Sequence, residues 1–155
     1  MQSEIYDVYD CLWYDIASSS THKSDYTKYP NNDIPISYEN DCTVLSETTG
    51  TEYRYGVNYT LPSDCTVEFD LNVSSNSVNN PYLYLKGWQP YLSSQVFNRD
   101  VWVNVKFILS NGNGKCFVEG VETPVTSSYN TGNGNLQLRY NNATLRFKNF
   151  KIYPI

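Results

Sequence analysis

Residues 65–73 read Cys-Thr-Val-Glu-Phe-Asp-Leu-Asn-Val, and this stretch decides the fold. Apolar side chains fill the odd positions and polar side chains the even ones, a period of two that is typical of a strand with one buried face. Residues 53–61 and 101–109 alternate in the same way. Because no segment shows the 3.6-residue apolar spacing of an amphipathic helix, the chain is predicted to be all-β.

Turn residues separate the alternating stretches. Leu-Pro-Ser-Asp at 61–64 separates the stretch 53–61 from the stretch 65–73. Asn-Gly-Asn-Gly at 111–114 predicts a hairpin that joins 101–109 to 115–121. Asn141-Asn142 turns residues 136–140 into the last strand. In that last strand the apolar phase slips from odd to even positions, which predicts a bulge near Lys148-Asn149.

Shorter strands are expected at 5–13, 42–46 and 82–86, and the polar stretch 18–32 is expected to be a long loop. Nine or ten short strands at regular spacing favour an antiparallel two-sheet sandwich of the jelly-roll kind. With 155 residues, the chain has the size of one such domain, so we expect residues 1–155 to form a single β-sandwich.

The charge distribution excludes some partners. The net charge of −5 argues against nucleic acid, and no apolar run is long enough to cross a membrane. Residues 1–80 carry thirteen acidic and three basic side chains, whereas 81–155 carry three acidic and eight basic. We expect the two halves to interleave so that these charges offset; the alternative is a basic face for an acidic glycan or partner. Residues 1–10 lack basic side chains, so no secretory signal is expected there.

The metal-binding residue types are sparse. No Cys-x-x-Cys pair occurs and there is one histidine, His22, so we expect no zinc and no cofactor. Asp7, Asp10 and Asp15 could contribute to a calcium site, but they form no dense cluster and we predict no metal. The cysteines at 11, 42, 65 and 116 are consistent either with buried thiols or with one or two disulfides.

Several segments carry a resemblance to a known family. Residues 66–72, 102–107, 116–121, 136–139 and 145–153 resemble the core strands of concanavalin-A-like and laminin-G-like jelly rolls. The opening 9–15, followed by a serine-rich loop, is similar to first strands of such domains in phage tail and adhesin-like proteins. The resemblance implies a concanavalin-A-like sandwich in which Trp102 is a packing residue, but it does not name a ligand, because function resides in the site.

Two groups of residues resemble catalytic arrangements. Glu68 and Asp70 share one face of their strand, as in the Glu-x-Asp-x-x-Glu strand of laminarinase-type hydrolases on this fold, but the final Glu is absent. The polar stretch around His22 is a poor platform for a catalytic triad. We therefore predict that the chain is not an enzyme, and that Glu68 and Asp70 belong to a solvated strand face.

Binding is better supported by the residue types. In Lys86–Tyr91, Trp88 and Tyr91 lie beside Gly and Pro, where their rings can stack on a sugar while Gln89 satisfies its hydroxyls. We predict Trp88, Gln89, Tyr91 and Tyr129 as ligand-binding residues, with Trp13 as a further candidate. The alternative for Trp88 is that it folds back and caps the core.

The predicted function is a glycan- or cell-surface-binding module without catalytic activity. Its partner would be a surface polysaccharide or glycan, and it would belong to a viral tail or receptor-binding appendage, or to an adhesin, on a virion or extracellular surface. The alternatives are a purely structural virion component with homo-oligomer or assembly partners, and a degenerate glycoside hydrolase.

Overall fold

The computed structural model describes residues 13–15, 26–31, 33–39, 42–57, 61–62, 64–85, 89–90, 98–111, 113–126 and 136–154. These residues form fourteen strands and no helix. The strands build two packed antiparallel sheets, so the predicted all-β jelly-roll sandwich is confirmed. The described residues include no helix with the length and apolar character needed to cross a membrane.

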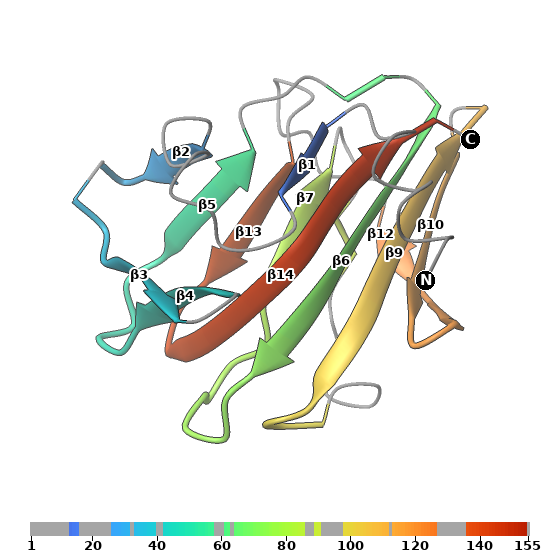
Figure 1. The fold of residues 1–155 in the computed structure, drawn as a ribbon. Coiled ribbons are helices and arrows are strands. Elements are labelled where there is room, and N and C mark those ends of the chain that lie inside the picture. The colour runs from blue at the N-terminus through green and yellow to red at the C-terminus, as the bar shows by residue number, and fades with distance from the viewer. Residues whose placement is uncertain are drawn as a thin grey trace.

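The larger layer, called the large sheet, runs through the whole width of the molecule (Figure 1). Its strand order is β11 (Val121–Thr123), β10 (Asn113–Val118), β9 (Trp102–Ser110), β6 (Cys65–Val73), β14 (Ala143–Tyr153), β4 (Cys42–Glu47), β3 (Ile36–Glu39), and β1 (Trp13–Asp15) pairs with the far end of β14.

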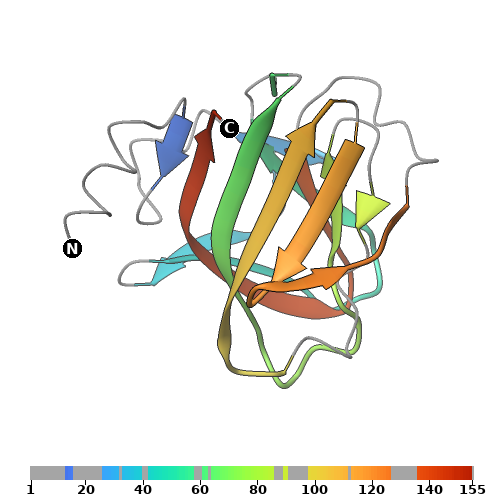
Figure 2. The ribbon, with the colours of Figure 1, turned by 90° about the vertical axis from the view of Figure 1, so that its right-hand side faces the viewer.

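The second layer, called the small sheet, lies behind the large one (Figures 1 and 2). Its strand order is β2 (Tyr26–Tyr29), β5 (Tyr53–Val57), β13 (Leu136–Tyr140), β7 (Tyr82–Leu85), and a separate short pair joins β8 (Gln89–Pro90) to β12 (Val125–Thr126). Neighbouring chain segments alternate between the layers, since β5 and β13 belong to the small sheet while β6 and β14 belong to the large one.

The core lies between the two sheets and follows the predicted alternation. Every odd residue of β6 is buried, and so are Val103, Val105, Phe107 and Leu109 of β9. The ring of Phe69 stacks on Phe150 with centroids 5.4 Å apart. Burial of such side chains stabilises the fold by about 1.5–3 kcal/mol each.

Two local predictions from turn chemistry are confirmed. The pairing of Asn113 with Ser110 makes β9 and β10 a tight hairpin whose turn begins at Asn111, with φ of 52°. The register of β14 against β6 shifts between Lys148 and Lys151, where Asn149 has φ of 54°. This bulge turns both Phe147 and Phe150 toward the core.

Three predictions were wrong. Tyr26–Tyr29, inside the expected loop 18–32, is strand β2, because Tyr26 stacks on the buried ring of Tyr55 with centroids 4.5 Å apart. Val101 does not extend the buried face of β9 but is 46% exposed, since β9 begins one residue later. The strand count also exceeds the expected nine or ten, because several strands have only two to four residues.

The structure resolves the alternatives for three cysteines. Cys42, Cys65 and Cys116 are buried as thiols, and Cys11 lies outside the described residues. Burial raises the pKa of the Cys116 thiol to about 12. Cys116 therefore contributes apolar packing to the core.

Candidate functional site

The outward face of the large sheet combines carboxylates, an amide, a lysine and aromatic rings across β6, β9, β10 and β14. The pairing register places Glu68 opposite Lys106, and Asp70 opposite Asn104. Lys106 in turn lies opposite Phe117. Even positions of β6 and β9 point away from the core, and Phe117 shares this face because residues opposite one another in register point to the same side of a sheet, so the five side chains share one surface.

The side chain of Asn104 is locked by the two neighbouring carboxylates. Its Nδ2 donates to Glu68 Oε2 at 2.9 Å and to Asp70 Oδ1 at 3.4 Å. The carboxylates are themselves held, since Tyr153 donates its hydroxyl to Glu68 Oε1 at 2.8 Å and Asn149 Nδ2 donates to Asp70 Oδ2 at 2.7 Å. Among the described residues Asn104 Oδ1 has no partner, so it is oriented as an acceptor for something else.

The backbone of Asn104 is locked by the turn that follows β10. Asn104 N–H donates to Glu119 Oε2 at 2.7 Å, and Glu119 N–H donates to the Asn104 carbonyl at 2.9 Å. Glu119 and Gly120 have φ of 50° and 77° and form the two-residue turn between β10 and β11. Two successive positive φ angles are the signature of a type I′ hairpin, and glycine adopts the second without steric cost.

These groups surround a shallow depression of about 280 Å³ lined by Asn104, Lys106, Ile108, Phe117 and Gly120. Phe117 is half-buried and offers an apolar ring face. Lys106 has no hydrogen-bond or ion-pair partner within the described part of the chain. The depression thus presents a fixed acceptor, a lysine ammonium as donor, and an aromatic surface within one small area.

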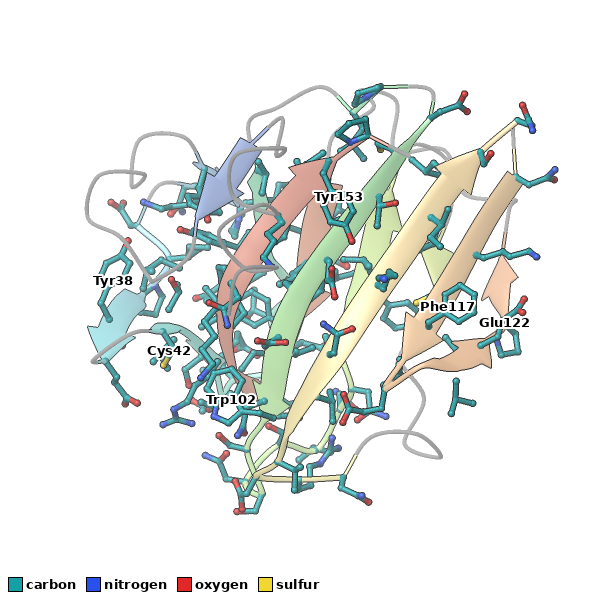
Figure 3. The ribbon with its side chains drawn as sticks, turned by 45° about the vertical axis from the view of Figure 1, so that its right-hand side comes forward. Tyr38, Cys42, Trp102, Phe117, Glu122 and Tyr153 are labelled. Atoms are coloured by element: carbon teal, nitrogen blue, oxygen red, sulfur yellow. The ribbon has the colours of Figure 1, made fainter. Side chains whose placement is uncertain are left out.

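Further aromatic side chains lie on the same face. Figure 3 looks onto the large sheet and shows Phe117 on β10, with Trp102 toward one end of the sheet and Tyr153 toward the other. The Lys148 ammonium lies 4.3 Å from the centroid of the Trp102 ring. Trp102 was expected to be a packing residue; it is half-buried on the outward face, outside the core, where Lys148 covers its ring.

Opposite charges alternate across this face. Glu68 lies between Lys106 and Lys151, and Asp70 is paired in register with Lys148. The acidic residues come from the first half of the chain and the lysines from the second, so the predicted interleaving of charge is confirmed. The face is nearly balanced in charge and suits an uncharged ligand better than an anionic one.

The structure does not test the predicted ligand-binding residues. Trp88, Tyr91 and Tyr129 lie outside the described residues. Gln89 belongs to β8, where its backbone pairs with Thr126, and its side chain is outside the described part. Trp13 pairs through its backbone with Ile152. The structure neither joins these residues into one site nor separates them.

The residues weighed for catalysis and metal binding have different outcomes. Glu68 and Asp70 do share the outward face, but the depression is lined by Asn104 and not by the two carboxylates. His22, Asp7 and Asp10 lie outside the described residues. Where the structure is described, no three His, Cys, Asp or Glu side chains gather to hold a metal ion.

Sequence reasoning missed Asn104, Lys106 and Phe117 as a group. They occupy two strands and meet only through the hairpin register. The turn residues at 111–114 contain the necessary information, because a tight turn at Asn111 fixes which residue of β10 lies opposite Lys106.

Comparison with known proteins shows the fold. No family model matches the chain, and no curated protein matches its sequence. Among solved structures, a sialidase matches with TM-score 0.70 and 12% identity, covering 94% of this chain and 19% of the sialidase. A Bacillus subtilis protein of unknown function with a galectin-like fold matches with TM-score 0.65 and 9% identity, covering 93% and 96%. The carbohydrate-binding module CBM66 from B. subtilis matches with TM-score 0.61 and 12% identity, covering 83% and 95%.

These similarities are consistent with a concanavalin-A-like sandwich. The chain spans about a fifth of the sialidase, 19% of its length, and nearly the whole of the other two proteins. At such low sequence identity, structural similarity establishes the fold but does not identify a ligand, because function resides in the site.

Proposed function

We propose that this chain is a non-catalytic carbohydrate-binding module that holds an uncharged sugar in the depression beside Asn104. The observation that carries the proposal is the locked Asn104 amide, which lines one depression together with the half-buried ring of Phe117 and with Lys106, a lysine that has no partner among the described residues. The structural similarity to the carbohydrate-binding module CBM66, which the match covers to 95%, supports carbohydrate binding in general.

The chemistry of the depression matches the chemistry of a sugar ring. A sugar presents hydroxyls at its edge and apolar C–H groups on its face. One hydroxyl would donate to Asn104 Oδ1 and a neighbouring hydroxyl would accept from the Lys106 ammonium, while the C–H face packs on Phe117. A few fixed polar groups beside an apolar wall are typical of small-ligand sites.

The arrangement of Glu68 and Asp70 favours binding over catalysis. A retaining glycosidase needs one carboxylate as nucleophile and another as acid/base, both reaching the scissile bond. Here both carboxylates accept hydrogen bonds from the one Asn104 amide and from Tyr153 or Asn149. They act as positioning groups for the amide.

A biological setting goes with this proposal. We propose that residues 1–155 form one module on a virion or extracellular surface. The module would belong to a viral receptor-binding appendage or to an adhesin that contacts a surface glycan. Trp88, Gln89, Tyr91 and Tyr129 remain proposed ligand contacts.

A glycan array tests the proposal and shows whether binding depends on the depression or on residues 88–91. The wild-type chain, Phe117→Ala and Trp88→Ala are applied to the same array of neutral and acidic glycans. We expect specific binding to a neutral glycan that is lost in Phe117→Ala and kept in Trp88→Ala. Loss in Trp88→Ala alone moves the site to 88–91, and a folded wild-type chain that binds no glycan contradicts the proposed function.

A further inference from the structure

A second pocket lies on the opposite side of the sandwich from the depression. It has a volume of about 230 Å³ and is lined by Asn79, Asn80, Tyr82, Arg139, Tyr140 and Asn141. These residues belong to the loop before β7, to β7 itself, to the end of β13, and to the turn between β13 and β14. Its volume is below the 300 Å³ or so at which drug-sized sites begin, so it suits one small ligand.

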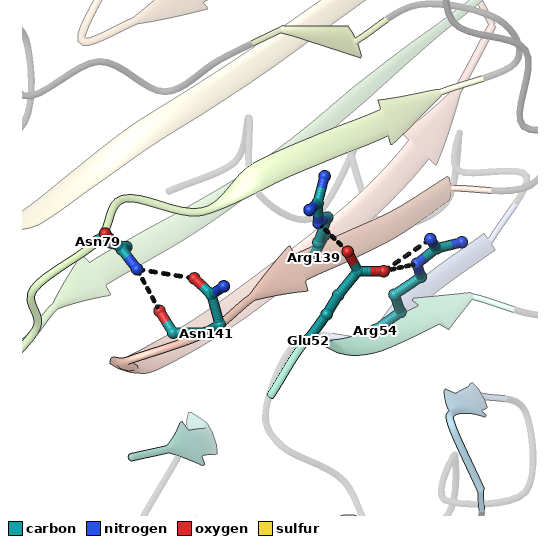
Figure 4. A network of polar contacts seen from close by, with 5 residues as sticks. All are labelled: Glu52, Arg54, Asn79, Arg139 and Asn141. Carbon is teal, nitrogen blue, oxygen red and sulfur yellow. Dashed lines mark hydrogen bonds and ion pairs between the residues drawn. The ribbon is translucent and has the colours of Figure 1, made fainter. Parts of the chain in front are cut away.

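The walls of this pocket are fixed by hydrogen bonds between the loop and the β13–β14 turn. Asn79 Nδ2 donates to Asn141 Oδ1 at 2.8 Å and to the Asn141 carbonyl at 3.3 Å (Figure 4). Val78 N–H donates to the Asn142 carbonyl at 2.7 Å. The pocket is therefore preorganised, which lowers the entropy cost of binding.

Two amide donors are left over by these hydrogen bonds. Asn80 is 7% exposed, and its Oδ1 accepts from Arg99 Nη1, so its Nδ2 points away from that arginine. Asn141 uses its Oδ1 for Asn79, which leaves its Nδ2 on the other side. Neither nitrogen has a partner among the described residues, although Asn80 is more than nine-tenths buried. Both donors are therefore available to a ligand that carries acceptor oxygens.

Arginines add positive charge around these donors. The Arg139 guanidinium is ion-paired with Glu52 and lies 5.3 Å from the centroid of the Tyr82 ring, so two neighbours orient it. Figure 4 shows Glu52 lying between Arg139 and Arg54, which share its carboxylate. Arg99, behind Asn80, has no carboxylate partner within the described part of the chain.

We propose that this pocket is a second ligand site and that it takes a small ligand bearing a carboxylate, of the class of a uronic acid residue. The carboxylate would accept hydrogen bonds from Asn80 Nδ2 and Asn141 Nδ2 beside the Arg139 charge. The ring hydroxyls of a sugar acid would face Tyr82. This pocket is separate from the depression at Asn104. Ligand binding in the pocket does not depend on whether the depression binds a sugar.

The experiment is an NMR titration of the ¹⁵N-labelled chain, residues 1–155, with galacturonate, galactose and acetate. We expect galacturonate to shift the signals of Asn79, Asn80 and Asn141, and to bind about tenfold or more tightly than galactose, since a charged hydrogen bond is lost in the neutral sugar. Acetate separates a site for any carboxylate from a site for a sugar acid, because only the sugar acid uses the rest of the pocket.

Two isosteric variants test the assigned donors. Asn141→Asp and Asn80→Asp keep the oxygen that accepts from Asn79 or Arg99 and replace the amide donor by an anionic oxygen. Each is expected to weaken galacturonate binding about tenfold or more. Phe117→Ala, at the other site, is expected to bind galacturonate as the wild type does. Equal binding of galactose and galacturonate, no binding by wild type, or unchanged binding by a folded Asp variant would overturn the inference.

Discussion

Asn104 and Glu119 hold each other through two hydrogen bonds, one from the Asn104 N–H to Glu119 Oε2 at 2.7 Å and one from the Glu119 N–H to the Asn104 carbonyl at 2.9 Å. The pair links the middle of β9 to the turn after β10. With Glu68 and Asp70 fixing the side chain of Asn104, both its backbone and its amide are set before any ligand arrives. This preorganisation is the basis of the proposed binding site.

Removing the Glu119 carboxylate should loosen this arrangement. Glu119→Ala is expected to destabilise the fold by about 1 kcal/mol and to weaken ligand binding, because the Asn104 N–H loses its acceptor. Glu119→Gln keeps an acceptor oxygen at the same reach and should retain most of the stability. Denaturant unfolding of the two variants checks this, and equal stability of Ala and Gln variants would contradict the role of the side chain.

Glu47 should make stability depend on pH in the acid range. Its carboxylate is buried and accepts hydrogen bonds from Thr49 N–H at 2.6 Å, Gly50 N–H at 3.0 Å and Asn142 N–H at 2.9 Å, as well as from the Thr49 hydroxyl. Burial alone would raise the pKa of Glu47, but these donors outweigh it and lower the pKa from 4.5 to about 2.

The sign of the pH effect follows from this shift. The unfolded chain takes up a proton on Glu47 near pH 4.5, whereas the folded chain does so only near pH 2, so stability is lost as pH falls through that interval. Glu47→Gln is expected to lower stability at pH 7 by about 2–3 kcal/mol and to reduce its loss between pH 4.5 and pH 2. Unfolding of wild type and variant across this interval measures both effects, and parallel pH profiles would contradict the assignment.

Tyr140 carries a hydroxyl that stabilises nothing among the described residues. The side chain is 2% exposed and its oxygen has no hydrogen-bond partner there. Tyr140→Phe is therefore expected to leave stability unchanged or to raise it by about 1 kcal/mol. Tyr153→Phe is the matched control, because that hydroxyl donates to Glu68 and its loss should destabilise. A lower melting temperature for Tyr140→Phe would show that its hydroxyl has a partner.

Cys116 should be unreactive while the chain is folded. It has no exposed surface, and burial raises the pKa of its thiol to about 12, so almost no thiolate forms at neutral pH. Alkylation at pH 8 followed by mass spectrometry should modify Cys116 only after denaturant is added. Rapid modification of the native protein would mean that β10 opens readily.

The strands with a clean period of two could be predicted from sequence. The buried odd residues of 65–73 and the phase slip at Lys148-Asn149 appear in the structure where the pattern places them. Strands β2 and β3 were not predicted, because each lies at the edge of a sheet and contributes few residues to the core. A short polar edge strand has almost no hydrophobic signal.

The candidate site was harder to predict for a different reason. Asn104 and Phe117 look like ordinary outward residues of two strands, and only their register with Lys106 brings them to one depression. The amide orientation depends on Glu68 and Asp70, which contact it from a strand thirty or more residues away. Such long-range pairings are absent from local patterns.

The most direct test of the central claim is the affinity of the neutral glycan selected on the array, measured by isothermal titration for wild type, Phe117→Ala, Lys106→Met and Tyr29→Ala. Tyr29 is the control, an exposed aromatic residue on the small sheet. A sugar held by the depression predicts affinity losses of about tenfold or more for Phe117→Ala and Lys106→Met, with Tyr29→Ala unchanged. Unchanged affinity in both Phe117→Ala and Lys106→Met, with the variants folded, would contradict a binding site at Asn104.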